Sequence, residues 1–369
     1  MIFFNNINLE NYRNFNNLNL IFDQKCNILY GSNGSGKTNI LESLSLFEKG
    51  RGFRKENINN LYNKNNTNKI FKISSSVTNN NENIDLLVTN EIKEQTFKKK
   101  IFVNNSDSRE SLNYFETLFS IISFLPEMER IFQNRTSERR NFFDRLIYGV
   151  DRKYIKLLNE YKKKLIERTK ILKNNIHDLN WLNQIEIEIV NLGIEIYKKR
   201  NNYISKLNTM ISKLNKPDNK LYNINFFIDD KLSSTELDDE HIKNLYLNEI
   251  KENREIDTYI GGAKVGPHKS DIRGINNFTN LNINQYSTGQ QKTIILLIIV
   301  AQSKLLIDEY KRKPIILFDE ICSHLDQNNR DLLLELIETL DIQTLMTGTE
   351  KKLFSFLSTK VSYFNININ

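Results

Sequence analysis

The sequence contains few of the residues that interrupt or cross-link a chain. Its 369 residues include only 13 Gly, 4 Pro and 2 Cys, whereas average usage would give about 26 Gly and about 18 Pro. This scarcity excludes collagen-like chains and Gly/Pro-rich low-complexity chains. The two cysteines, Cys26 and Cys322, have no metal-ligand spacing and provide no disulfide framework, so we expect a cytoplasmic protein in a reducing environment.

Long apolar segments are also missing. The longest apolar run, at 294–301, is far shorter than the roughly 20 residues that a membrane-spanning helix needs. The N-terminal sequence MIFFNNINLENYRNF has neither a basic region nor a cleavable apolar stretch, so it does not resemble a signal peptide. We therefore expect no membrane partner.

The residues that are present fit a large folded chain. Hydrophobic residues make up 39% and charged residues 26% of the sequence, which is enough apolar material for a core. The length allows two to three domains. Lys and Arg (52) exceed Asp and Glu (45), for a net charge of +7. This modest basic excess permits nucleic-acid binding without requiring it.

A phosphate-binding motif lies near the N-terminus. The segment GSNGSGKT at 31–38 matches G-x-x-x-x-G-K-[ST] at every required position. It follows a short apolar run, CNILY at 26–30, and precedes NILESLSLF at 39–47, whose apolar residues share one helical face. A Gly-rich turn can match this pattern by chance, but the strand and helix on either side favour a functional P-loop.

The spacing of that motif has a chemical reason. Backbone N–H groups of the loop would surround the β-phosphate of ATP, and the following helix N-terminus would add donors and a dipole. Lys37 would neutralise phosphate charge in catalysis, and the Thr38 hydroxyl would bind Mg²⁺. The predicted nucleotide-binding residues of this loop are Gly31, Ser32, Asn33, Gly34, Ser35, Gly36, Lys37 and Thr38.

A second group of motifs lies near the C-terminus. YSTGQQKT at 286–293 precedes an apolar, helix-like run, and IILFDE at 315–320 reads as a buried parallel strand that ends in two carboxylates. Asp319 would hold Mg²⁺, and Glu320 would orient or deprotonate the attacking water. An ordinary strand end is the alternative, which the upstream P-loop disfavours. The next segment, SHLD at 323–326, also fits a helix N-cap.

In this order, the segments resemble the RecF family of ABC-type ATPase heads, which is related to SMC and Rad50. The resemblance extends from Asn11 to about Glu350. It is carried by NYRNF (11–15), GRGFR (50–54), FLPEMER (124–130), RRNFFDRL (139–146), GPHKSDI (266–272), STGQQKT (287–293), LFDEICSHLD (317–326) and TLMTGTE (344–350).

The resemblance implies further site residues. Arg13 and Asn14 of the N-terminal segment are placed in the nucleotide site. Ser287, Gly289 and Gln290 of the signature would cap an ATP molecule held by the P-loop of a second chain. No switch histidine is apparent after the acidic strand, although Thr347 and Thr349 lie near that place.

The middle of the chain is an insertion. Roughly 250 residues separate Thr38 from Ser287, far more than the dozen or so that a crossover needs. The segment 70–103 alternates short apolar stretches with turns, which predicts an antiparallel β-meander. Helical periodicity over 151–214, interrupted at 177–181, predicts an antiparallel helical lobe whose apolar stripe fits core packing, with a partner-binding face as the alternative.

Together these features predict an α/β fold: a P-loop ABC-type ATPase head with a mixed sheet and an antiparallel β lobe, plus an inserted helical lobe. The predicted parts are 1–125 (head, with P-loop and meander), 126–258 (helical lobe) and 259–369 (head, with signature and acidic strand). Three groups of basic residues each have more than one possible role. Lys98–Lys100 fits DNA contact or edge-strand protection, whereas Arg139 and Arg140 fit DNA contact, intramolecular pairing or nucleotide sensing.

By resemblance, we expect an ATP-dependent, DNA-binding recombination mediator with slow, DNA-stimulated ATP hydrolysis. An ATP-gated homodimer would bind double-stranded DNA near single-strand gaps and help to load recombinase in gap repair, replication restart and the SOS response. The implied partners are gapped DNA, RecR- and RecO-type mediators and a RecA-type recombinase, with ATP and Mg²⁺ as cofactors.

Two other functions stay open at this point: an ABC transporter ATPase subunit and a non-catalytic, ATP-dependent interaction protein. The long insertion between P-loop and signature argues against the first. The presence of both Asp319 and Glu320 argues against the second.

Overall fold

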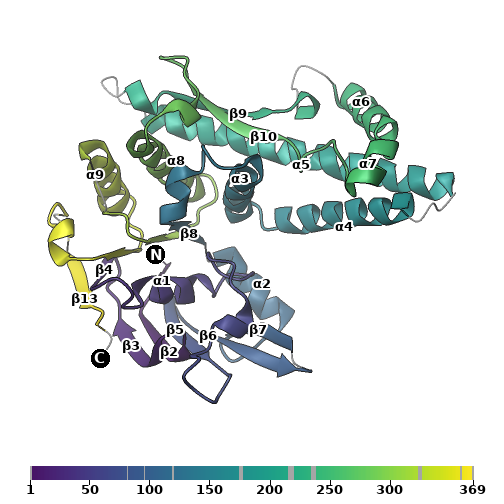
Figure 1. The fold of residues 1–369 in the computed structure, drawn as a ribbon. Helices are drawn as coiled ribbons and strands as arrows, with labels where there is room; N and C mark the ends of the chain where they lie inside the picture. The colour runs from purple at the N-terminus through teal and green to yellow at the C-terminus, as the bar shows by residue number, and fades with distance from the viewer. Residues whose placement is uncertain are drawn as a thin grey trace. The chain divides into compact units, whose positions relative to one another are not determined.

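The computed structural model describes residues 2–80, 82–94, 96–118, 120–173, 178–214, 220–233, 238–322, 326–357 and 360–367. His177 of the predicted helix break and 323–325 of the SHLD segment lie outside these residues. The chain forms two compact units (Figure 1). Unit 1 combines Met1–Glu129 with Ile295–Asn369, and unit 2 is Arg130–Ile294.

Unit 1 contains a parallel five-stranded sheet in the order β13-β4-β12-β11-β8. Four of its strands are almost wholly buried, which explains their continuous apolar sequences. The predicted strands CNILY and IILF are confirmed. The strands are β4 (Cys26–Tyr30), β8 (Ile121–Phe124), β11 (Ile315–Phe318), β12 (Thr344–Gly348) and β13 (Val361–Asn365).

A second, antiparallel sheet forms the other layer of unit 1, in the order β3-β2-β5-β6-β7, with β1 paired to β5. Burial alternates along β5 and β6, as expected when one face packs on a core. The predicted meander is confirmed as β5–β6–β7. The strands are β1 (Ile2–Phe4), β2 (Asn6–Tyr12), β3 (Phe15–Ile21), β5 (Lys72–Asn79), β6 (Glu82–Lys93) and β7 (Thr96–Val103).

The helices of unit 1 follow the predicted motifs. Helix α1 directly continues the P-loop, and Asp326 caps α9 by accepting a hydrogen bond from Asn329 N at 2.8 Å, which confirms the helix-cap interpretation for that residue. Helix α8 begins in unit 2 and continues into unit 1. The helices are α1 (Lys37–Ser45), α2 (Arg109–Leu118), α8 (Thr288–Asp308) and α9 (Gln327–Leu334), the last extended by a π-helical turn at Glu335–Thr339.

Unit 2 is mainly helical, and its long helices α4 and α5 pack side by side (Figure 1). A two-stranded antiparallel sheet joins β9 to β10. The elements are α3 (Thr136–Val150), α4 (Tyr154–Lys173), α5 (Leu179–Leu214), β9 (Ile224–Asp229), α6 (Asp239–Glu252), α7 (Arg254–Ile260) and β10 (Asp271–Asn276). Short 3-10 helices lie at Ile58–Asn60, Pro126–Arg130, Lys220–Tyr222, Lys231–Ser233, Ile283–Gln285 and Lys351–Phe354.

The packing of the chain bears on the predicted helix break and on the predicted domain division. The predicted break at 177–181 is wrong for Leu179 and Trp181, which belong to α5 because Asp178 caps that helix by accepting a hydrogen bond from Trp181 N at 2.9 Å. Residues 259–294, which we place in the head from the sequence, pack within unit 2, where β10 pairs with β9. The predicted domain boundaries at 126 and 258 stay a prediction.

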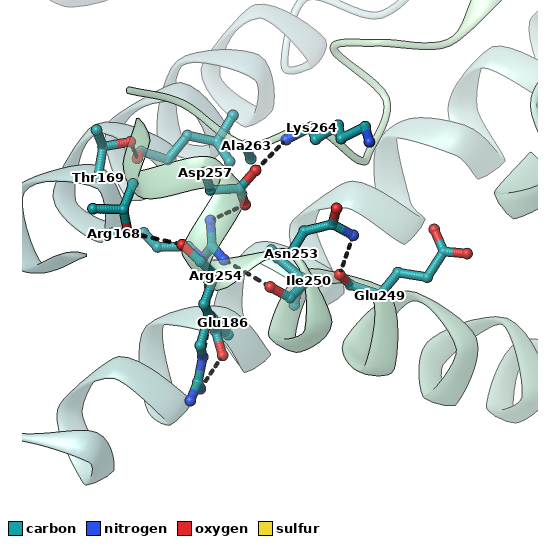
Figure 2. Close-up of polar contacts among 12 residues, drawn as sticks. Arg168, Thr169, Glu186, Glu249, Ile250, Asn253, Arg254, Asp257, Ala263 and Lys264 are labelled. Carbon is teal, nitrogen blue, oxygen red and sulfur yellow. Dashed lines mark hydrogen bonds and ion pairs between the residues drawn. The ribbon is translucent and has the colours of Figure 1, made fainter. Parts of the chain in front are cut away.

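A buried ionic network holds the helices of unit 2 together (Figure 2). Arg168 of α4 is 1% exposed. Its guanidinium donates to Glu186 of α5 at 2.9 Å and to Asp257 of α7 at 2.6 Å. Arg254 also donates to Glu186. Because every member of the network is paired, these buried charges tie three helices together at defined positions.

Among the described residues, one helix is long and apolar enough to cross a membrane. This helix is α8, and 83% of the apolar window is buried inside the protein. Residues 294–301 are each at most 1% exposed. Such burial is typical of a core helix.

Candidate nucleotide-binding and catalytic site

The P-loop connects the carboxyl end of β4 to α1, so its backbone donors lie at the edge of the parallel sheet. Gly36 precedes the helix with φ 95°, in the left-handed region. A Cβ at this position would lie 2.5 Å from Phe15 Cζ. Both the backbone conformation and the close approach therefore require glycine. Ser32, Asn33 and Gly34, in contrast, are exposed and accessible to a ligand.

Lys37 lies inside this loop. Its Nζ donates hydrogen bonds to Gly31 O at 2.8 Å and Ser32 O at 2.7 Å, and the residue is 4% exposed. Burial lowers the pKa of the ammonium, while the nearby carboxylates of Glu320 and Asp319 oppose this effect. A buried cation held at the centre of the loop is placed to meet phosphate oxygens.

One buried hydroxyl in the loop has no hydrogen-bond partner among the described residues. Ser35 is only 2% exposed, and its polar Oγ atom is buried. An unsatisfied buried polar atom is costly and calls for an explanation such as an additional ligand. Phosphate oxygens would supply the missing acceptor, so this loop fits the nucleotide that its sequence motif predicts.

The turn between β2 and β3 packs against the P-loop. Asn14 donates to Ser35 O at 3.4 Å and accepts a hydrogen bond from Asn39 of α1 at 2.7 Å. Arg13 instead forms a two-pronged pair with Glu42 of α1, at 2.9 and 2.7 Å. The turn therefore supports the loop and its helix, whereas direct contact of either residue with the nucleotide stays a prediction.

The predicted metal ligands meet at the carboxyl end of the sheet. Thr38 Oγ1 donates to Asp319 Oδ1 at 2.9 Å, and Asp319 is 5% exposed. Mg²⁺ in phosphate sites is held by one or two protein ligands together with phosphate oxygens and water. Among the described residues no cluster of three His, Cys, Asp or Glu side chains could hold a metal alone. Thr38 and Asp319 suit a metal shared with a nucleotide.

Glu320 projects into solvent directly after Asp319. Its backbone has φ 51°, a left-handed conformation that costs an ordinary residue about 1–2 kcal/mol. The strain is offset locally because Glu320 N donates to Thr347 Oγ1 at 2.8 Å. A strained, exposed carboxylate beside a predicted metal ligand is typical of an active site.

Thr347 is the site residue that the sequence did not identify. Its hydroxyl donates to Asp319 Oδ1 at 2.8 Å and accepts from Glu320 N, so it connects the predicted metal ligand to the predicted base. The sequence indicated only that it lies near the place of the missing switch histidine. The sequence signal that could identify Thr347 is a hydroxyl residue at the end of an apolar strand that follows the acidic strand.

The signature lies at the N-terminus of α8, in unit 2. Ser287 N donates to Gln290 Oε1 at 3.0 Å, and Gln290 N donates to Ser287 Oγ at 3.3 Å, a reciprocal capping box. Ser287–Gln290 are exposed. Gly289 is helical, and a Cβ on it would meet no atom within 4 Å. The described part of this chain gives no reason for glycine at that position.

The sequence of this chain is similar to those of known proteins. The family described as the RecF/RecN/SMC N terminal domain matches residues 3–367. Proteins named DNA replication and repair protein RecF are similar along almost their whole length. The protein of Rickettsia typhi is 34% identical over 356 residues, and that of Rickettsia prowazekii 34% identical over 353 residues. The matches cover 94% of both chains in the first case and 95% in the second.

Solved structures give the same result. A structure of the recombination mediator protein RecF, described as RecF-ATP in the RecFOR pathway, has a TM-score of 0.81 and 26% identity, covering 100% of this chain and 98% of the other. A second, described as RecF-ATPrS, has a TM-score of 0.82 and 26% identity, covering 98% and 96%. An SMC head bound to a domain of ScpA has a TM-score of 0.54 at 16% identity, which supports the fold alone.

The fold and the site define an ATPase head of the SMC-related class. Within that class, the chain belongs to the RecF family, as its sequence motifs indicate. The predicted fold class is confirmed.

Proposed function

We propose that this protein is an ATP-dependent, DNA-binding recombination mediator that hydrolyses ATP slowly and uses hydrolysis as a switch. One observation carries the proposal: Thr38, Asp319 and Glu320 meet at the end of the parallel sheet beside Lys37. In this arrangement Lys37 would bind phosphate, Thr38 and Asp319 would hold Mg²⁺, and Glu320 would accept the proton of the attacking water. Mg²⁺ would supply charge neutralisation at the phosphates.

The proposed switch is an ATP-dependent homodimer. Glycine inside a helix costs about 0.5–1 kcal/mol relative to alanine, and the described contacts of this chain do not account for Gly289. Close approach of a second molecule does account for it. Ser287, Gly289 and Gln290 would therefore cap an ATP molecule bound to the partner's P-loop, where a helix N-terminus favours phosphate.

The proposed ligand of the dimer is double-stranded DNA near single-strand gaps. The support is the family: its relatives are named DNA replication and repair proteins, and the similar structures are assigned to the RecFOR pathway. We propose RecR- and RecO-type partners, loading of a RecA-type recombinase, and a role in the SOS response in the cytoplasm. Membership of the RecF family removes the basis for the transporter alternative.

The test is retention of gapped duplex DNA by the dimer. Glu320→Gln should form a stable ATP-dependent dimer that retains DNA during gel filtration, because ATP binds but is not hydrolysed. Lys37→Met should remain monomeric with ATP and should release the DNA. Turnover unaffected by Glu320→Gln would show that this carboxylate is not the base, and absence of DNA from the trapped dimer would exclude the mediator function.

A further inference from the structure

Unit 2 contains a small cavity, lined by both charged and apolar side chains, that the nucleotide site does not use. Its volume is about 130 Å³, and it lies among α3, α4, α5 and the segment that leads into β10. Two segments that resemble the RecF family, RRNFFDRL and GPHKSDI, meet in its wall. The polar lining residues used below are Ser137, Arg140, Asn141, Asp144, Lys162, Arg200 and His268.

Of the three arginines at or near the cavity, two form ion pairs with the nearby carboxylates. Arg139 forms a two-pronged pair with Asp271, with both contacts at 2.8 Å. Asp144 is held in the same way by Arg200, with both contacts at 2.9 Å. Both nearby carboxylates are therefore committed to other arginines.

Arg140 is the arginine that remains. Its described contact is a hydrogen bond from Nη1 to Ser270 O at 2.5 Å, and it forms no ion pair with any described carboxylate. The guanidinium is half-buried. Its pKa is lowered by burial and by the positive charge of Arg200, although Asp144 and Asp271 oppose this shift. Four of its five N–H donors are thus available for an acceptor, preferably an anion.

The other lining groups favour the same ligand. Lys162 is exposed at the cavity and has no ion-pair partner among the described residues, and Ser137 and Asn141 add polar atoms. His268 Nε2 lies 2.8 Å from Ala263 O, and its Nδ1 lies 2.8 Å from Tyr161 OH. Burial lowers the pKa of His268 to about 4, so it is neutral near pH 7. Positive charge therefore exceeds negative charge around the cavity.

We propose that this cavity binds a phosphate group, with Arg140 as the principal ligand and Lys162, Ser137 and Asn141 beside it. The inference extends the proposed DNA-binding function, because the group is either a backbone phosphate of DNA or a free phosphate. Guanidinium groups bind phosphate through two parallel hydrogen bonds, which Arg140 can supply and the paired Arg139 and Arg200 cannot.

The experiment compares Arg140→Gln and Lys162→Gln with Lys163→Gln in the full chain. Lys163 is the matched control because it is the next residue of α4, is exposed and does not line the cavity. Binding of inorganic phosphate is measured by ³¹P NMR with ATP saturating the P-loop of the Glu320→Gln chain. Binding of duplex DNA is measured by fluorescence anisotropy over a range of salt concentrations.

Arg140→Gln is expected to weaken binding of the true ligand by about 10- to 100-fold. Lys162→Gln should weaken this binding by less, and Lys163→Gln should not change it. If the ligand is DNA, the slope of log K against log salt falls by about 1 for each lost phosphate contact. Loss of phosphate binding alone would identify a free anion. Unchanged binding of both probes by Arg140→Gln and Lys162→Gln, or no binding by the parent chain, would overturn the inference. ATP-dependent dimerisation of these variants reports on the proposed function separately.

Discussion

Thr347 Oγ1 donates a 2.8 Å hydrogen bond to Asp319 Oδ1 and accepts one of the same length from the backbone N–H of Glu320. One hydroxyl group thus positions both acidic residues of the proposed catalytic site. It also links β12 to the end of β11, where the parallel strands deliver these residues. Thr347 is fully buried, so the geometry of the acidic pair depends on this contact.

Thr347→Val should therefore reduce catalysis more than binding. Valine keeps the shape but leaves the Glu320 N–H without this acceptor and removes a donor to Asp319. We expect kcat to fall by roughly 10- to 100-fold, equivalent to one or two hydrogen bonds of about 1–3 kcal/mol. Thr347→Ser should retain most activity, and the exposed Thr349→Val is the control. Equal turnover by Thr347→Val and wild type would show that the contact is only structural.

Asp319→Asn tests the shared metal site. Asparagine preserves the hydrogen bond from Thr38 but removes the charge that attracts Mg²⁺. Hydrolysis should require at least about tenfold more Mg²⁺, because charge-assisted contacts contribute about 1.5–3 kcal/mol. Titration of ATPase activity with Mg²⁺ measures the shift. Identical Mg²⁺ curves for the variant and wild type would contradict the assignment of Asp319 as a ligand.

Gly289 and Gly193 are both helical glycines, but they differ in their surroundings. A Cβ on Gly193 would lie 2.6 Å from Tyr246 Cε1, whereas one on Gly289 would meet nothing within 4 Å. Gly289→Ala should stabilise the ATP-free chain by about 0.5–1 kcal/mol yet weaken ATP-dependent dimerisation. Gly193→Ala should destabilise the fold. Urea unfolding measures the change in stability, and gel filtration with ATP measures dimerisation. Normal dimerisation by Gly289→Ala would contradict close approach of a second molecule to Gly289.

Arg168 is expected to be the most sensitive residue of the buried network in unit 2. Arg168→Met removes the buried ion-pair partner that Glu186 and Asp257 share. The free energy of unfolding should fall by about 3–5 kcal/mol. Lys170→Met, on the exposed face of the same helix, should change stability by less than about 0.5 kcal/mol. Urea denaturation measures both. Equal stability of the two variants would show that the network is dispensable.

His268 should make the fold sensitive to mild acid. Burial lowers its pKa to about 4, below the ordinary value near 6.5. The folded state then favours the neutral form of His268. Its contribution to the free energy of unfolding is therefore fully present above pH 6.5 and is lost as the pH falls toward 4. Between pH 7.5 and 5 this loss is about 2 kcal/mol. The stability of His268→Gln should fall less over this interval, and parallel pH profiles for both proteins would contradict the assignment.

The parts of the site that are local in sequence could be predicted. CNILY and IILFDE carry strand patterns, and GSNGSGKT carries a fixed spacing of phosphate-binding groups between a strand and a helix. The structure places these strands and this loop as expected. The parallel order of their strands brings Thr38 to Asp319 across a long sequence separation. This contact follows from the motif chemistry even though no local pattern contains it.

The remaining features depend on tertiary pairing. The double role of Thr347 requires knowing that β12 lies beside β11. The unpaired state of Arg140 requires knowing that Asp271 pairs with Arg139 and Asp144 with Arg200. The helix start at Leu179 was missed because the cap at Asp178 was not recognised from the sequence. In each case the sequence shows the residue types, and the fold decides which of them meet.

The central claim is that each ATP site combines the P-loop of one chain with the signature of another. Complementation tests it directly: Lys37→Met and Ser287→Arg chains are assayed alone and as an equal mixture. In a mixed dimer one site carries both defects and the other carries neither. Because neither variant should dimerise alone, the dimers in the mixture are mixed ones, each with one intact site of two. The account therefore predicts almost no ATPase activity for either variant alone and recovery of up to about half of wild-type turnover after mixing. No recovery on mixing, or ATP-dependent dimerisation and full turnover by Ser287→Arg alone, would contradict it.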